Sequence, residues 1–204
     1  MRTHEKVIVA HHLILTLYGH WLPNDPRGSG SMELYDDKFD ELGPIHHGRK
    51  PDAQQPSRKE LRAFYNEADE LLNFPRSWMD DAKRQAAAQA FGKVVRRERY
   101  TCYACAVLAN HAHFVIRRHR DDALAMMSNL SAESAGVLRA FGDVGVQHPV
   151  WAARPYKVFL CSVEDIDSRV RYVERNPVKE GLPAQQWDFV TVYDGWPQKR
   201  RGKP

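Results

Sequence analysis

TCYACAVLANHAHFVIRRH, residues 101–119, contains two runs of apolar and aromatic residues separated by a short break at Ala109-Asn110. Two such runs around a short break are typical of a β-hairpin. We therefore expect antiparallel strands over TCYACAVL (101–108) and HFVIRRH (113–119), joined by a tight turn. This hairpin decides the fold, because the segments before and after it have to supply its neighbours in the sheet.

The segments on either side of the hairpin predict the remaining strands and helices. VIVAHHLILTLYG (7–19) and PYKVFLCS (155–162) are rich in branched and aromatic residues, as strands are. We expect helices over residues 57–74, which begin with the capping-box pattern Ser57-Arg58-Lys59-Glu60, over 77–99, over 121–141, and over 163–176 before Pro177. This order predicts an α+β fold: a ferredoxin-like, split βαββαβ antiparallel sheet with helices on one face, plus an additional C-terminal helix that carries Tyr172.

A long segment between the first strand and the first helix interrupts this pattern. Residues 21–56 are dense in Pro, Gly and Asp, and a loop of this length inside a compact domain is often a lid or a binding element. The 204 residues are enough for one hydrophobic core. We expect a single catalytic domain over residues 1–204, with a loop insertion at about 21–56 and a basic tail from about 183.

The composition is that of an ordinary globular protein. Hydrophobic residues make up 43% and charged residues 27% of the chain, which argues against disorder. No stretch approaches the roughly 20 apolar residues that a membrane span needs. The first residues lack the long apolar core of a secretion signal, so we expect a cytoplasmic protein.

The positive charge is gathered in clusters. The formal net charge is +4 at pH 7, and the isoelectric point is about 9.0. The clusters are Arg96-Arg97-Glu98-Arg99, Arg117-Arg118-His119-Arg120, and Lys199-Arg200-Arg201 with Lys203. Clustered cations suit a polyanion, because each phosphate contact releases condensed counterions. Solvated helix ends and a basic tail give the same pattern, so the charge permits nucleic-acid binding without proving it.

The three cysteines, Cys102, Cys105 and Cys161, are too few and odd in number for a disulfide framework. The first two have the spacing of half a zinc site. In a strand, however, a separation of three residues puts the two side chains on opposite faces. No second pair follows in the sequence, so we expect buried structural thiols.

His111 and His113 are the first candidate functional residues. Positions two apart in a strand point to the same face, so the two imidazoles project together while Ala112 faces the other way. Two neighbouring imidazoles can bind one divalent metal through neutral ring nitrogens. An isolated His-x-His also occurs on solvated sheet faces, so a metal site needs a third ligand. His11-His12 point to opposite faces of the first strand and receive no role.

The last helix offers both a third ligand and a nucleophile. Tyr172 and Asn176 are four residues apart and therefore share one helix face. Taken alone, Tyr172 is an ordinary residue at the edge of the core, next to the inward-facing Val170 and Val173. Cleavage of a phosphodiester by a tyrosine needs a metal to polarise the phosphoryl oxygen and a hydroxyl in line with the leaving oxygen. Arginines on the same helix can supply nearby positive charge.

Two segments resemble a known family. NHAHFVI (110–116) resembles the His-hydrophobic-His strand of HUH endonucleases, and YVERNPVKEGL (172–182) resembles the Tyr-x-x-x-Asn-Pro-Val-Lys-x-Gly-Leu segment of REP-associated tyrosine transposases. The motifs occur in the order and on the element types that this single-tyrosine HUH superfamily uses, so the resemblance covers roughly residues 7–182. Ala112 is smaller than the usual middle residue, and the insertion at 21–56 is longer than in compact members.

The resemblance implies a mechanism. Tyr172 attacks the phosphate of single-stranded DNA, forms a 5′-phosphotyrosine and frees a 3′-hydroxyl, while His111, His113 and Asn176 hold one Mg²⁺ or Mn²⁺. The implied partner is single-stranded or hairpin DNA, bound by a monomer or a homodimer. The cations expected to bind this DNA are Arg117, Arg118, Arg120, Arg169, Arg171, Arg175 and Lys179.

Two other functions remain open from the sequence. The chain can be a transposase-derived protein that binds hairpin or single-stranded DNA without cutting it. It can also be a metal-dependent hydrolase that uses water, in which case Tyr172 has no role. Formation of a covalent protein–DNA species would distinguish the strand transferase from both of these alternatives.

Overall fold

The computed structural model describes residues 7–28, 37–153 and 155–197. Its elements are β1 (Ala10–Thr16), the 3-10 turns η1 (Asp37–Leu42) and η2 (Asp52–Gln54), α1 (Arg58–Leu71), α2 (Asp81–Glu98), β2 (Cys102–Val107), β3 (His111–Arg117), α3 (Ala123–Arg139), β4 (Tyr156–Leu160) and α4 (Val163–Lys179). The predicted order of strands and helices is confirmed. None of the described helices is both long and apolar enough to cross a membrane.

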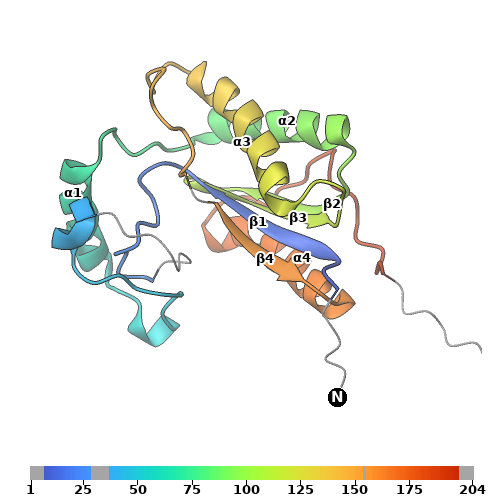
Figure 1. Ribbon diagram of the computed structural model, residues 1–204, viewed down its shortest axis with the longest axis horizontal. Coiled ribbons are helices and arrows are strands. Elements are labelled where there is room, and N and C mark those ends of the chain that lie inside the picture. The colour runs from blue at the N-terminus through green and yellow to red at the C-terminus, as the bar shows by residue number, and fades with distance from the viewer. Residues whose placement is uncertain (1–6, 29–36, 154, 198–204) are drawn as a thin grey trace, which may run out of the picture.

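The four strands form one sheet in the order β2-β3-β1-β4, and every neighbouring pair is antiparallel. This is the arrangement predicted for an α+β, split βαββαβ fold. Figure 1 shows α2 and α3 covering one face of the sheet, while α4 lies on the other face. The strands β1 and β3 occupy the centre, so their side chains are enclosed from both sides.

Alternation along the central strands divides the side chains between two cores. Leu13 and Leu15 of β1, with Phe114 of β3, belong to the core under α2 and α3. Val115 of β3 packs instead with Val173 in the core under α4. Because successive residues of a strand face opposite sides, the residues between these positions in β1 and β3 are directed toward α4. The sheet thereby carries His12, His111 and His113 to the α4 face.

The cysteines show one departure from strict alternation. Cys102 and Cys105 both lie in the core under α2 and α3, so the prediction of opposite faces is wrong. The register of β2 against β3 shifts between Cys102 and Ala104, and the extra residue of this bulge reverses the alternation. The prediction of buried thiols is confirmed for Cys102 and Cys105, whereas Cys161 is only partly buried. Burial raises the pKa of the Cys102 thiol to about 12.

Several helix boundaries also differ from the prediction: α1 ends at Leu71 instead of residue 74, and the start of α2 and the end of α4 lie elsewhere as well. The helix α2 begins after Asp80, whose carboxylate accepts a hydrogen bond from the Lys83 amide, and Ser77 lies outside it. The helix α4 continues through Pro177 to Lys179 instead of ending at Asn176. A proline removes one helical N–H and usually ends a helix.

The last turn of α4 is closed by a C-terminal cap that follows Pro177. The Leu182 amide donates to the Pro177 carbonyl at 2.9 Å, and the Gly181 amide donates to the Val178 carbonyl at 3.1 Å. Gly181 has φ +76°, which glycine adopts without a steric penalty. This cap satisfies the last carbonyls of the helix, so Asn176 lies inside a helical turn rather than at its end.

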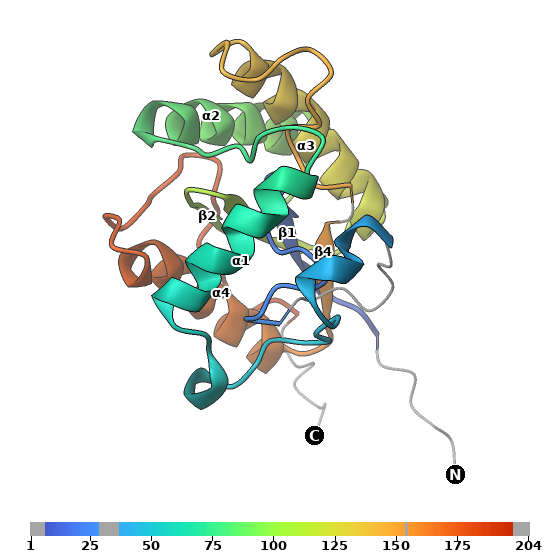
Figure 2. The same cartoon turned by 90° about the vertical axis from the view of Figure 1, so that its left-hand side faces the viewer.

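The insertion and α1 form a small unit of their own. Leu22, Phe39, Phe64, Tyr65 and Ala68 make a separate hydrophobic cluster. Figures 1 and 2 place α1 beyond the end of the sheet at which β1 finishes. The described parts of 21–56 therefore pack against α1. They lie near the end of the sheet at which β3 begins with His111.

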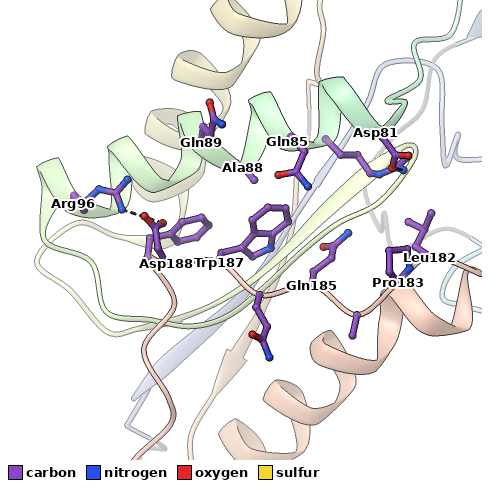
Figure 3. A pocket seen from close by; sticks show the side chains of 14 residues that line it. Asp81, Gln85, Ala88, Gln89, Arg96, Leu182, Pro183, Gln185, Trp187 and Asp188 are labelled. Carbon is purple, nitrogen blue, oxygen red and sulfur yellow. Dashed lines mark hydrogen bonds and ion pairs between the residues drawn. The ribbon is translucent and has the colours of Figure 1, made fainter.

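The chain after α4 covers the edge of the sheet formed by β2. The Gln185 side chain donates to and accepts from the Val107 backbone, both at 2.8 Å, and the Thr191 amide donates to the Cys102 carbonyl at 2.8 Å. A hollow of about 400 Å³ remains between this tail and α2. Figure 3 shows this hollow with Gln85 on α2 across from Trp187 on the tail.

Two glycines test how tightly the tail is packed. A Cβ built on Gly92 of α2 lies 2.8 Å from the ring of the buried Phe189, whereas nothing lies within 4 Å of a Cβ built on Gly136 of α3. Alanine is better than glycine in a helix by about 1 kcal/mol, and overpacking costs about 1–3 kcal/mol. We expect Gly136→Ala to raise the free energy of unfolding by up to about 1 kcal/mol and Gly92→Ala to lower it by about 1–2 kcal/mol, measured by urea denaturation. Equal stabilisation by both variants would show that the tail is not packed against α2.

Candidate active site

Three histidines meet on the sheet face that α4 covers. His111 and His113 project together from β3, as predicted, and their ring centroids are 4.7 Å apart. His12 comes from the neighbouring β1, where its ring stacks on that of His113 at 5.1 Å. The His12 Nε2 and His113 Nδ1 atoms are 3.0 Å apart, within hydrogen-bond distance. The cluster therefore depends on the pairing of two strands that are far apart in the sequence.

In both histidines of β3, the Nδ1 atom of the ring faces a hydrogen-bond partner. His113 uses Nδ1 toward His12, and the Nδ1 atom of His111 lies 2.6 Å from the Asn110 Oδ1 atom. The Nε2 atom of His113 is buried and has no hydrogen-bond partner among the described residues. A buried ring nitrogen without a partner is costly. In both rings, Nε2 is thus the atom left to bind a ligand.

The environment keeps these imidazoles uncharged. Burial lowers the pKa of His111 to about 4, with smaller contributions from the charges of His20 and Arg27. Burial lowers the pKa of His12 to about 3 and that of His113 well below its ordinary value, and the positive charge of Arg169 adds to both effects. Neutral imidazoles are the form that binds metals. The site therefore presents nitrogen lone pairs at neutral pH.

Tyr172 lies beside the histidines. Its ring meets the rings of His113 and His12 edge-on, with centroids 5.8 Å and 6.0 Å away. The Tyr172 side chain is half-buried, whereas the next residue, Val173, points into the core and is completely buried. Two cations flank the ring: the Arg169 guanidinium lies 5.7 Å and the Lys179 ammonium 5.4 Å from its centroid.

Asn176 follows Tyr172 by one turn of α4. Its residue is 7% exposed, and a separation of four residues puts it on the same helix face as Tyr172. Arg169 and Lys179 belong to this face as well, at separations of three and seven residues from Tyr172. The extension of α4 through Pro177 is what keeps Asn176 within this stripe.

The donor atoms of the cluster fit a divalent metal. Among the described residues, no group of three or more His, Cys, Asp or Glu side chains is positioned to hold a metal ion. The expected set of His111, His113 and Asn176 is of a different kind, since it combines two imidazoles with an amide oxygen. Nitrogen and oxygen donors of this type suit Mg²⁺ or Mn²⁺ when positions remain for water and phosphate. The buried and unpartnered His113 Nε2 supports the fit.

The cations expected to bind DNA fall into two groups. Arg117, Arg118 and Arg120 line an open hollow at the far end of β3, where the Arg117 guanidinium stacks 3.6 Å above the Trp196 ring. The other group, Arg169, Arg171, Arg175 and Lys179, lies on α4. Of these, Arg171 pairs with Asp167. The basic cluster at residues 199–203 lies outside the described residues.

Sequence reasoning missed three side chains of the site: His12, His20 and Asn110. The signal for His12 was present in β1, because the leucines at 13, 15 and 17 alternate with it and belong to the core under α2 and α3. A residue out of phase with them has to face α4. His20 and Asn110 lie in connections between elements, where periodicity gives no orientation.

Comparisons with known proteins give resemblances in structure and none in sequence. No protein-family model matches the chain, and no curated protein matches it. A solved structure of a REP-associated tyrosine transposase bound to a REP hairpin is similar over 90% of this chain and 76% of its own chain. The TM-score is 0.48 and the sequence identity is 15%.

The buried neutral histidines predict a loss of stability in mild acid. Their pKa values are lowered in the folded chain, so below about pH 6.5 the unfolded chain binds protons that the folded chain does not. The free energy of unfolding therefore falls as the pH decreases, by up to about 2 kcal/mol at pH 5 for each histidine that stays neutral.

We expect the thermal unfolding midpoint of the metal-free protein to be several degrees lower at pH 5 than at pH 7.5. Replacement of one of these residues, His20→Phe, should reduce that difference. Equal midpoints at the two pH values would contradict the lowered pKa values.

Proposed function

We propose that the chain is a metal-dependent endonuclease and strand transferase that acts on single-stranded DNA at or beside hairpins. The observation that carries this proposal is the placement of the Tyr172 ring against the His12–His113 pair, with Asn176 on the same helix face. A nucleophile beside donors for one metal is the arrangement that cleavage of a phosphodiester by tyrosine requires. The resemblance of residues 110–116 and 172–182 to HUH proteins supports the same function.

In the proposed reaction, the Tyr172 oxygen forms a bond to phosphorus as the bond from phosphorus to the 3′ oxygen breaks. The phenol loses its proton and the departing 3′ oxygen gains one, so the products are a 5′-phosphotyrosine and a free 3′-hydroxyl. One phosphodiester replaces another, and the strands can be rejoined without a nucleotide cofactor. His111, His113 and Asn176 would hold the divalent cation, which when bound polarises the phosphoryl oxygen.

The cations around Tyr172 would assist this chemistry. Arg169 and Lys179 lie 5.7 Å and 5.4 Å from the centre of the phenol ring, where their charge would offset that of a phosphate brought to the hydroxyl. Arg118, Arg120 and Arg175 are exposed and can contact the DNA backbone. Contacts of this kind fix the position of a nucleic acid and carry no sequence information.

The first test is the formation of a covalent adduct. Purified protein is incubated with a labelled library of single-stranded hairpins and Mn²⁺, and the products are separated on a denaturing gel. We expect a protein–DNA band with the intact chain that disappears when EDTA removes the metal. We expect Tyr172→Phe and His111→Ala to reduce the band at least 10³-fold, because they remove the nucleophile and a metal ligand.

A second tyrosine provides the control for the adduct. Tyr156 on β4 is 44% exposed, so Tyr156→Phe should leave the band unchanged. Tyr172→Phe should still shift hairpins on a native gel. Tight hairpin binding without an adduct under any divalent metal would favour the non-catalytic binding protein. Cutting that survives Tyr172→Phe would favour the hydrolase that uses water.

The exposed Arg118 tests where DNA lies on the surface. If it contacts a phosphate, Arg118→Ala weakens hairpin binding for all sequences and reduces the slope of log affinity against log salt by about 0.7–0.9. Fluorescence anisotropy at several salt concentrations measures this slope. An unchanged slope would place the DNA away from the hollow formed by Arg117, Arg118 and Arg120.

A further inference from the structure

A chain of hydrogen bonds leads from a backbone carbonyl to His111. The His20 Nε2 atom lies 2.9 Å from the Ser77 carbonyl oxygen. The Asn110 Nδ2 atom lies 3.4 Å from the His20 Nδ1 atom, and the Asn110 Oδ1 atom lies 2.6 Å from the His111 Nδ1 atom. Four groups from three separate parts of the chain are thus connected in one line.

The chemistry of these groups fixes the direction of every hydrogen bond. A carbonyl oxygen only accepts, so the His20 Nε2 atom carries a proton and donates to Ser77. His20 is neutral at pH 7, since burial lowers its pKa to about 4, and its Nδ1 atom therefore accepts from the Asn110 amide nitrogen. The Asn110 oxygen is then the atom that faces His111. It accepts, so His111 donates from Nδ1 and keeps a lone pair on Nε2.

We propose that Asn110 and His20 are positioning residues for the metal site: they hold His111 in the Nδ1–H tautomer and aim its bare Nε2 atom at the metal. The metal part of this inference rests on the proposed function, while the tautomer does not. Partners of this kind fix the orientation of a ligating imidazole, and their loss typically weakens metal binding 10- to 100-fold.

Neighbouring residues hold this chain of hydrogen bonds in place; we call the chain from the Ser77 carbonyl through His20 and Asn110 to His111 the relay. His20 is 4% exposed, and its ring meets the Trp78 ring edge-on at 4.3 Å. The backbone around Asn110 is fixed on both sides, because its carbonyl accepts from the Leu17 amide at 2.9 Å and the Ala109 carbonyl accepts from the Met79 amide at 2.7 Å. The relay therefore joins the turn of the hairpin to the segments that follow β1 and precede α2.

The unit formed by the insertion and α1 supports His20 from the other side. The Trp21 amide, next to His20, donates to the Tyr65 hydroxyl at 3.1 Å, and that hydroxyl also contacts the completely buried Asp25. The Arg27 guanidinium forms an ion pair with Asp25 and stacks 3.8 Å from the Trp21 ring. The insertion thus contributes a rigid support for a residue two hydrogen bonds away from the proposed metal ligand.

The tautomer can be read directly in the metal-free protein. Long-range proton–nitrogen correlation spectra of histidine-labelled protein at pH 7.5 distinguish protonated from bare ring nitrogens. We expect His111 protonated at Nδ1 and His20 protonated at Nε2 in the intact chain. In Asn110→Leu, the His111 signals should move toward the other tautomer. Protonation of His111 at Nε2 in the intact chain would overturn the proposal.

Manganese affinity tests the positioning role without any cleavage assay. Titration calorimetry should show 10- to 100-fold weaker Mn²⁺ binding for Asn110→Leu, and weaker binding for His20→Phe, which keeps the ring packed on Trp78. Asn110→Asp should keep part of the affinity that Asn110→Leu loses, because its carboxylate still accepts from the His111 Nδ1–H group although it no longer donates to the His20 Nδ1 atom. If Asn110 only stabilised the fold, aspartate at this position would not recover Mn²⁺ affinity relative to leucine.

His148 provides a matched control for His20. It is also buried, its Nε2 atom lies 2.8 Å from the Pro75 carbonyl oxygen, and it is not part of the relay. His148→Phe should leave both the His111 tautomer and the Mn²⁺ affinity unchanged. Equal affinity in all four variants would overturn the positioning role. Failure of the intact chain to bind Mn²⁺, with the expected tautomers present, would overturn the proposed metal site instead of the relay.

Discussion

The antiparallel pairing of β1 with β3 is the interaction on which the candidate site depends. Its register sets Ile14 opposite His113 and Val115 opposite His12, so the two histidines lie on adjacent diagonal positions of one face. A shift of one residue would turn His12 toward α2 and α3 and separate it from His113. The two hydrophobic cores prevent such a shift, because each has to receive its own set of apolar side chains from the same two strands.

The helix α4 adds the second part of the candidate site, because it packs on the sheet face to which the register directs His12 and His113. Val170 and Val173 of α4 belong to the hydrophobic core on this face of the sheet, and the burial of His12 and His113 keeps their imidazoles neutral. The helix also brings the phenol of Tyr172 to the histidines, with Asn176 one helical turn further along α4. The layer that removes water from the sheet is therefore also the one that carries the proposed nucleophile and the proposed third metal ligand, so the stability of this face and the arrangement of the proposed site are linked.

Local patterns in the sequence predicted the elements and the residues that neighbour one another along the chain. The pair His111 and His113, and the pair Tyr172 and Asn176, follow from the two-residue period of a strand and the 3.6-residue period of a helix. The features that were missed depend on contacts between distant segments. The bulge after Cys102 is set by pairing with β3, the turn beyond Pro177 by its glycine cap, and the position of His20 by α1 and Trp78.

The tail that follows α4 has a consequence for association between molecules. An uncovered edge strand offers unpaired amides and carbonyls to any other extended chain, and soluble proteins protect such edges. In the described residues, Gln185 and Thr191 occupy backbone groups at both ends of β2. Addition of a foreign strand there would first have to displace the tail, together with the buried Phe189. The described sheet therefore offers only β4 for growth into a larger sheet, which limits the routes to aggregation to one edge.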